Sequence, residues 1–136
     1  MKILLDTNVV LDVLIAREPF ANDANAVFQQ IETGLHQGCL CATTVTTIEY
    51  FASQSLGAAQ SRLQIGLLLE AFSVALVDEK ILVSAQKSKQ KDFEDAVLTH
   101  AAIASGVEAI ITRNTKDFKN CGVAVFTPKE WLAARL

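Results

Sequence analysis

The sequence predicts an α/β fold in which a central, mainly parallel five-stranded sheet lies between two layers of helices, a three-layer α/β/α arrangement. Short apolar runs alternate with longer segments of helical spacing along all 136 residues. The runs are continuously apolar, as strands buried on both faces are. No repeat or low-complexity linker interrupts the pattern, and the length suits one domain. We therefore expect a single domain over residues 1–136.

Each expected element rests on a local signal. The strands are short apolar runs at residues 3–5, 39–43, 73–77, 109–112 and 123–126. Apolar residues three and four positions apart predict helices at residues 8–16, 20–36, about 44–57, 58–72, 78–88 and 93–105. Thr127, Pro128 and Glu130 supply an N-cap, a first-turn proline and a capping-box partner, so a last short helix begins there.

Composition limits the possible functions. Hydrophobic residues make up 51% of the chain, which excludes a disordered protein. Twelve Lys and Arg oppose fifteen Asp and Glu, giving a net charge of −3. Such a protein does not bind nucleic acid through bulk charge, so local basic groups or metal ions would have to neutralise phosphates.

The cysteines and the start of the chain indicate a compartment. Cys39, Cys41 and Cys121 form no CxxC pair, and we expect reduced thiols rather than a zinc site or a disulfide. No signal peptide is evident, and the apolar stretch at residues 9–16 is too short to span a membrane. We therefore expect a cytoplasmic protein with no membrane partner.

Acidic residues stand at the points where the chain should reach one edge of the sheet. Asp6 directly follows the first strand, and Asp117 follows the fourth. Glu49 lies early in the helix after the second strand, and Asp92 and Asp95 open the helix that leads into the fourth. Reactive sites in such folds lie beyond the carboxyl ends of the strands. Four or five carboxylates are therefore expected in one cleft.

Crowded carboxylates repel one another, and a divalent cation relieves the repulsion. Oxygen ligands without nearby His or Cys select Mg²⁺ or Mn²⁺, which can activate a water and stabilise phosphoryl charge. Each acid also has a structural explanation. Asp95 could be only the capping partner of Asp92, Glu49 could partner Thr46 in the same way, and Asp117 could lie on a solvated turn. Asp6 favours function, because a buried strand gives no other reason for a carboxylate at its end.

Two basic groups flank these acids. Lys87, Lys89 and Lys91 lead into the Asp92 segment, while Arg113, Lys116 and Lys119 flank Asp117. Both groups could hold phosphates, although a solvated charged face is the commoner explanation. We favour Arg113 and Lys116 as the phosphate-binding pair.

An ordered set of segments resembles the PIN domain. The segments are MKILLDTNVVLD at 1–12, IE at 48–49, DFEDAV at 92–97, TRN at 112–114 and KDF at 116–118. The likeness extends through nearly the whole chain. It is greatest to small bacterial PIN proteins, which include the toxins of type II toxin–antitoxin pairs.

This resemblance implies a metal-dependent endoribonuclease that hydrolyses RNA phosphodiesters. Asp6, Asp95 and Asp117 would bind the metal directly or through water, and Glu49 would complete the catalytic acids. Asp92 would be a further ligand or only a cap. The supporting polar residues would be Asn8, Thr112 and Asn114.

The resemblance also implies partners. These are an RNA substrate and, for a toxin, an antitoxin. The apolar surplus at residues 44–72 could form a homodimer face, an antitoxin groove or simply a filled core.

Other functions compete with this interpretation. A phosphotransferase of the haloacid-dehalogenase type needs a second Asp where this chain has Asn8, and a receiver domain needs an acidic pair that is absent. The remaining alternatives are a PIN fold that binds RNA or protein without cutting, and a housekeeping RNA-processing nuclease.

Overall fold

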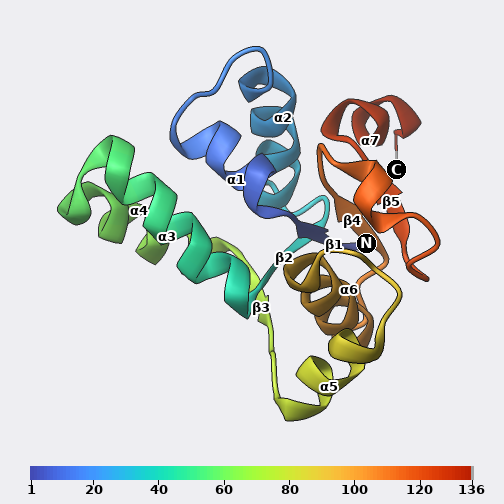
Figure 1. Cartoon of the computed structure of the whole chain (residues 1–136). Coiled ribbons are helices and arrows are strands. Elements are labelled where there is room, and N and C mark those ends of the chain that lie inside the picture. Colours follow the sequence, from blue (N-terminus) through green and yellow to red (C-terminus); the bar gives the residue numbers. More distant parts are fainter. Residues whose placement is uncertain (136) are drawn as a thin grey trace.

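A computed structural model describes residues 1–135 and shows a sheet enclosed by helices (Figure 1). The strands are β1 (Lys2–Leu5), β2 (Gln37–Cys41), β3 (Ser73–Ala75), β4 (Ala109–Ile111) and β5 (Ala124–Phe126). The helices are α1 (Thr7–Leu14), α2 (Ala21–Glu32), α3 (Ala42–Leu56), α4 (Ala58–Ala71), α5 (Glu79–Lys87), α6 (Phe93–Ala104) and α7 (Pro128–Ala134). A short 3₁₀ helix, η1, covers Thr115–Phe118.

The sheet has the strand order β3-β2-β1-β4-β5, and every neighbouring pair is parallel. This confirms the predicted α/β class with five strands. The chain first adds β2 and β3 on one side of β1, then β4 and β5 on the other. The order reverses between β1 and β4, and at such a point the loops separate and leave a crevice beyond the strand ends. Asp6 and Thr112 follow these two strands.

Alternation along the central strand divides the core into two parts, because successive side chains point to opposite faces. Ile3 and Leu5 belong to the core that packs under α1, α2, α3, α4 and α7. Leu4 belongs to the other core, with α5, α6 and Phe118 of η1. The predicted three-layer α/β/α arrangement is therefore present. Cys39 and Cys41 are free, buried members of the second core.

Several boundaries differ from the sequence prediction. The helix α2 ends at Glu32 and β2 begins at Gln37, because Gln37 already pairs with Lys2 of β1. Residues 42–43 belong to α3 rather than to a strand. The 3₁₀ helix η1 occupies a segment for which we predicted no element. The capping box at the start of α7 is present as predicted.

The helices α3 and α4 form a hairpin that extends from one side of the sheet (Figure 1, left). Large apolar side chains are exposed along it: Tyr50, Phe51, Leu63, Leu67 and Leu69. The filled-core explanation for this segment therefore accounts for only part of its apolar residues. No helix within residues 1–135 combines the length and hydropathy that crossing a membrane requires.

Candidate active site

Asp6 is fixed at the end of the central strand. Its backbone N–H donates to Ile111 O of β4 at 2.9 Å, and Asp6 is the N-cap of α1. Thr7 N donates to Oδ1 at 2.8 Å, and Thr112 Oγ1 donates to Oδ2 at 2.8 Å. Burial raises the pKa of Asp6 above its ordinary value; the bonds from Thr112 and Thr7 oppose this, and the charges of Asp92 and Asp117 add to it. The carboxylate is thus held in one orientation.

Two predicted supporting residues make the hydrogen bonds that such a role requires. Thr112 is fully buried, and its hydroxyl accepts from Asn114 N at 3.0 Å while donating to Asp6. Asn8 Nδ2 lies 3.4 Å from Asp6 Oδ2, and Asn8 Oδ1 accepts from Arg113 N at 3.2 Å. The ends of β1 and β4 are therefore joined by polar side chains. Asn114 takes part through its backbone.

The first turn of α6 brings two further aspartates. Asp92 is the N-cap, and its Oδ1 accepts from Asp95 N at 3.0 Å. The predicted cap therefore exists, but it uses the backbone of Asp95 and leaves the carboxylate of Asp95 free for another role. Desolvation, together with the charges of Asp6, Asp92, Asp117 and Glu94, raises the pKa of Asp95 from 3.8 to about 7. Asp95 is half-buried.

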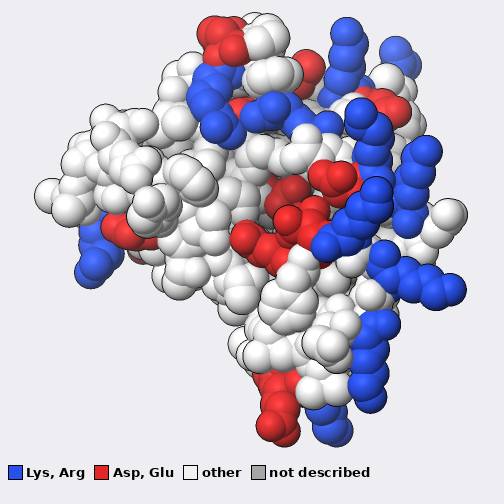
Figure 2. Space-filling model, viewed as in Figure 1, with Lys and Arg blue, Asp and Glu red and all other residues white. Residues whose placement is uncertain are grey.

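Asp117 comes from η1 rather than from a simple turn. Its N–H donates to Asn114 O at 3.0 Å, and buried Phe118 anchors the helix in the core beside α6. Asp117 is exposed, yet its charge acts on both Asp6 and Asp95. Figure 2 shows acidic side chains gathered in a hollow at the centre of one face. We call Asp6, Asp92, Asp95 and Asp117 the aspartate cluster.

Glu49 is the predicted acid that the structure links least to this cluster. It is half-buried on α3, and none of the largest effects on Asp6 or Asp95 comes from it. Thr46 lies inside α3, where its hydroxyl donates to Thr43 O, so Thr46 does not cap the helix as the alternative explanation required. Instead Thr47 Oγ1 of α3 donates to Glu94 Oε1 at 3.4 Å. Sequence reasoning missed Glu94, for which no local pattern gave a signal.

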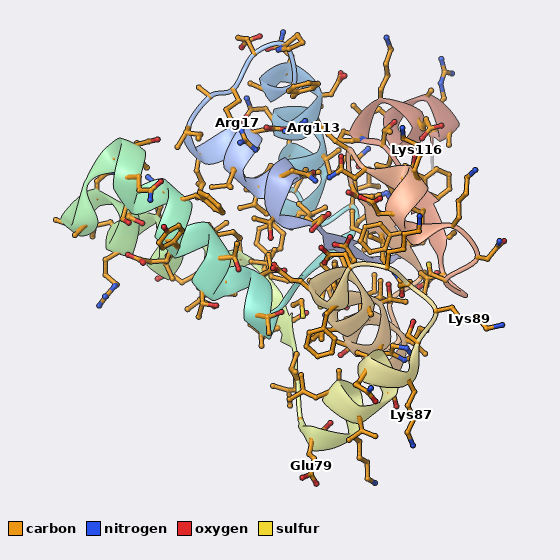
Figure 3. The ribbon with its side chains drawn as sticks, viewed as in Figure 1. Arg17, Glu79, Lys87, Lys89, Arg113 and Lys116 are labelled. Atoms are coloured by element: carbon orange, nitrogen blue, oxygen red, sulfur yellow. The ribbon has the colours of Figure 1, made fainter. Side chains whose placement is uncertain are left out.

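Asp12 forms a second acidic centre that sequence reasoning did not assign. It has no exposed surface, and its carboxylate accepts from Arg17 Nε at 2.8 Å and from Arg113 Nε at 2.7 Å. Arg113 Nη2 adds a third bond at 3.2 Å, and its guanidinium carbon lies 3.9 Å from the centre of the Phe20 ring. Figure 3 shows Arg17 and Arg113 beside α1. We call Asp12, Arg17 and Arg113 the arginine clamp.

The clamp bears on the predicted phosphate-binding pair. Two nitrogens of Arg113 are bound to Asp12, and 26% of its side chain stays exposed. Lys116, by contrast, is exposed on η1 next to Asp117. Phosphate binding stays a prediction for both residues, with Lys116 the less encumbered of the two.

The donors of the aspartate cluster suit a hard divalent cation, because they are all carboxylate oxygens and because burial, together with their mutual repulsion, raises the pKa of Asp95. Their spacing is a separate matter. Within residues 1–135, no group of three or more His, Cys, Asp or Glu side chains stands close enough to hold an ion as placed. The ligand chemistry therefore fits Mg²⁺ or Mn²⁺, and binding would require the side chains to draw together.

The fold and this cluster define a class of protein: a parallel α/β domain with carboxylates gathered at the carboxyl edge of the sheet. The chain belongs to the PIN domain family, whose family model matches residues 2–116. No curated protein matches the chain.

Solved structures share the fold over nearly the full length. A toxin–antitoxin complex from Klebsiella pneumoniae is 24% identical with a TM-score of 0.69, over 92% of this chain and 96% of that one. FitAcB from Neisseria gonorrhoeae is 23% identical with a TM-score of 0.69, over 93% and 98%. The chain also resembles VapC20 of Mycobacterium tuberculosis, a Sarcin-Ricin loop cleaving toxin, at 11% identity and a TM-score of 0.64 over 79% and 86%.

Proposed function

We propose that this protein is a divalent-metal-dependent endoribonuclease, the toxin of a toxin–antitoxin pair. One observation carries the proposal: the aspartate cluster lies at the switch point of the sheet with no cationic side chain paired to it within residues 1–135. A fold does not keep an uncompensated acidic cluster for stability, because the repulsion is unfavourable. Perturbed carboxylates in a cleft are typical of functional sites.

Each residue has a defined part in this proposal. Asp6, Asp95 and Asp117 would hold Mg²⁺ or Mn²⁺, with Asp92 as a further ligand. A bound ion of this kind lowers the pKa of water and neutralises charge on a phosphoryl group. Thr112 and Thr7 N orient Asp6 through their hydrogen bonds. Lys116 would bind a phosphate beside Asp117, and Glu49 would join the catalytic acids from α3.

RNA is the proposed substrate on the strength of family membership and of the similarity in fold to a toxin described as cleaving the Sarcin-Ricin loop. A protein partner is proposed on different grounds. The exposed apolar side chains of the α3–α4 hairpin form a surface of the kind that partners cover. The Klebsiella pneumoniae structure of similar fold is described as a toxin–antitoxin complex. We therefore assign this hairpin to an antitoxin helix, with a second copy of the chain as the competing occupant.

A second candidate function is a PIN domain that binds RNA without cutting it. The observation in its favour is that, within residues 1–135, no three candidate ligands stand within reach of one ion as placed. The aspartate cluster argues against it, because acids repel phosphates unless a cation lies between them.

The test is cleavage of a mixed RNA pool by purified wild type and by Asp6→Asn, with Mg²⁺, with Mn²⁺ and with EDTA. Asp23→Asn, the same chemical change in the first turn of α2, is the matched control. We expect cutting by wild type and by the control, only with metal, and a loss of about 100-fold or more in Asp6→Asn. Folded, partner-free wild type that cuts with neither metal would replace the nuclease by the binding module.

A further inference from the structure

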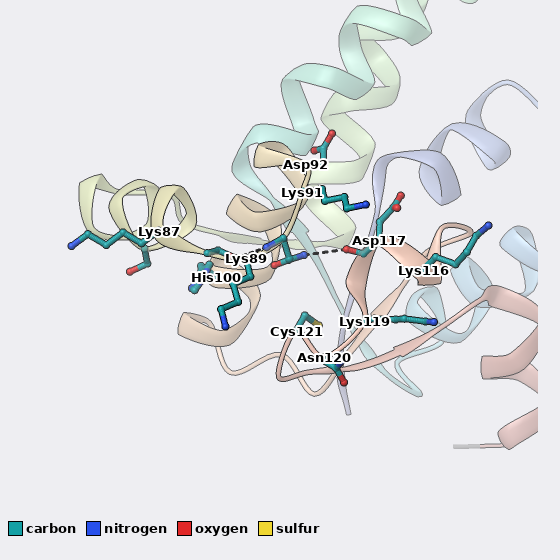
Figure 4. Close-up of a pocket in the computed structure, with 13 residues that line it drawn as sticks. Lys87, Lys89, Lys91, Asp92, His100, Lys116, Asp117, Lys119, Asn120 and Cys121 are labelled. Atoms are coloured by element: carbon teal, nitrogen blue, oxygen red, sulfur yellow. Dashed lines mark hydrogen bonds between the residues drawn. The ribbon is translucent and has the colours of Figure 1, made fainter.

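A large open cleft lies beside the aspartate cluster, with a volume of about 990 Å³. One wall is the end of α5 and the loop into α6, and the other is η1 with the residues that follow it (Figure 4). Gln90 Nε2 donates to Asp117 O at 3.4 Å and so ties the two walls together. Asp92 and Asp117 line the cleft and also belong to the aspartate cluster. The cleft therefore opens directly onto the candidate active site.

The cleft concentrates positive charge in an acidic protein. Five of the eight lysines in the sequence line it: Lys87, Lys89, Lys91, Lys116 and Lys119. All five are exposed, and none has an acidic partner within 4.0 Å in the part of the chain that the structure describes. With two aspartates among the lining residues, the local charge is +3, whereas the whole chain carries −3.

Three of the seven other Lys and Arg side chains are less available. Arg17 and Arg113 are bound to Asp12, and Lys2 Nζ donates to Ser105 O at 2.8 Å. Figure 2 shows blue side chains along the right-hand edge of the face, beside the central acidic hollow. A positive groove that is continuous with an acidic centre is suited to a polyanion that must pass that centre. Phosphates near the aspartates are repelled, and neighbouring phosphates need cations to hold the strand in place.

We propose that this lysine cleft binds the sugar–phosphate backbone of single-stranded RNA on one side of the scissile phosphate. The inference rests on the proposed function for the identity of the polyanion. An elongated ligand fits better than a small anion, because the five lysines lie on two walls of a wide cleft rather than around one point. Exposed lysines that contact phosphates add affinity without reading sequence. The cleft would thus set affinity and strand path, and the aspartate cluster would set the position of cutting.

The experiment compares two triple variants of equal charge change. The cleft variant is Lys87→Gln, Lys89→Gln, Lys119→Gln, which spares Lys91 and Lys116 next to the aspartates. The control is Arg62→Gln, Lys80→Gln, Lys129→Gln, at three exposed positions that do not line the cleft. Both are made in an Asp6→Asn background, and binding of a fluorescent, unstructured RNA of about 15 nucleotides is measured by anisotropy across a salt series.

We expect the cleft variant to bind about tenfold more weakly than its parent. Its slope of log affinity against log salt should be about 2 units shallower, because a single strand loses about 0.7 units for each phosphate contact. The control should stay within about twofold of the parent. Equal losses in the two variants, no loss in either, or no RNA binding by the parent would overturn the proposal.

Cleavage by the same triples with Asp6 intact separates this proposal from the nuclease proposal. Lysine-dependent binding without any cleavage would retain the cleft and reject the nuclease. Metal-dependent cleavage with equal RNA binding in the two triples would retain the nuclease and reject the cleft.

Discussion

Asp6 of the aspartate cluster and Asp12 of the arginine clamp lie a few residues apart in the chain, but their carboxylates have opposite electrostatic surroundings. Asp12 is fully buried, yet two arginines bind it with three hydrogen bonds. Asp6 is nearly as buried, but it accepts only from neutral donors and faces other carboxylates. Burial alone therefore does not separate a structural acid from a functional one. The presence of a cationic partner does, because it decides whether the charge stabilises the fold or is left for a ligand to neutralise.

The clamp also supports the cluster. Arg113 N donates to Asn8 Oδ1, and Arg17 Nη2 donates to Asn8 O at 3.1 Å. Asn8 in turn lies within hydrogen-bonding distance of Asp6 and Thr112. Asp12, through its two arginines, thus fixes the loops that hold Asp6 in position.

Removing the carboxylate of Asp12 should have the largest effect on stability. Asp12→Ala leaves two partly buried arginines without their partner, and we expect a loss of about 3 kcal/mol in the free energy of unfolding. Urea denaturation followed by circular dichroism measures it, with Asp23→Ala as the control. A loss no larger than the control's would show that Asp12 is not a structural acid and would remove the contrast.

The hydroxyl between the two strands should have the next largest effect. Thr112→Val keeps the shape but removes the partner of Asn114 N and leaves Asp6 Oδ2 with only the 3.4 Å contact from Asn8 Nδ2, so we expect a loss of about 1–2 kcal/mol. The hydrogen bond from Thr112 lowers the pKa of Asp6, so its loss should move the acidic limb of the pH–activity profile to higher pH. Thr112→Ser should restore both. A profile that does not move in Thr112→Val would mean that this bond does not tune Asp6.

Removing the carboxylate of Asp95 should change the stability of the fold in the opposite direction to removing that of Asp12. The folded-state pKa of Asp95 is about 7, above the value of 3.8 for the unfolded chain. Between those values the folded protein holds a proton that the unfolded chain releases, so stability from this group falls as the pH rises from about 4 through 7. Asp95→Asn removes that loss. Because solvent screens the half-exposed Asp95, the effect on stability is smaller than the full pKa shift implies. We expect the metal-free variant to be about 1 kcal/mol more stable than wild type at pH 8 and equal to it near pH 4.

Denaturation of the metal-free proteins at the two pH values measures this difference, and Asp23→Asn serves as the control. A variant that is destabilised at pH 8 would show that Asp95 has a favourable partner in the folded protein.

The sequence located those aspartates whose place at the end of a strand or the start of a helix is enough to put them at one edge of the sheet. Asp6 ends a buried strand and Asp92 begins a helix, and parallel strands bring such points to one edge. Prediction was weaker for residues inside a helix, where the face on which a side chain lies decides what it contacts. One residue along a helix turns the side chain by about 100°, and Thr47 rather than Glu49 makes the hydrogen bond that joins α3 to Glu94.

Pairing across the chain was not predictable at all. Asp12 and Arg113 are 101 residues apart, and no local pattern joins them. The sequence predicted phosphate binding for Arg113, which stays a prediction, but it did not predict that the guanidinium binds Asp12. This pairing appears only when β4 ends beside α1.

The most direct test of the uncompensated cluster is a thermal denaturation series with Mn²⁺ or Mg²⁺ at pH 7.5, on wild type, Asp95→Asn and Asp23→Asn. A ligand at about 100 times its Kd stabilises the folded state by about 2.7 kcal/mol, which raises Tm by roughly 5–15 °C in a domain of this size. We predict that rise in wild type and in Asp23→Asn, with little or none in Asp95→Asn. An equal rise in all three proteins, or none in wild type, would contradict the claim that this cluster is built to hold a divalent cation.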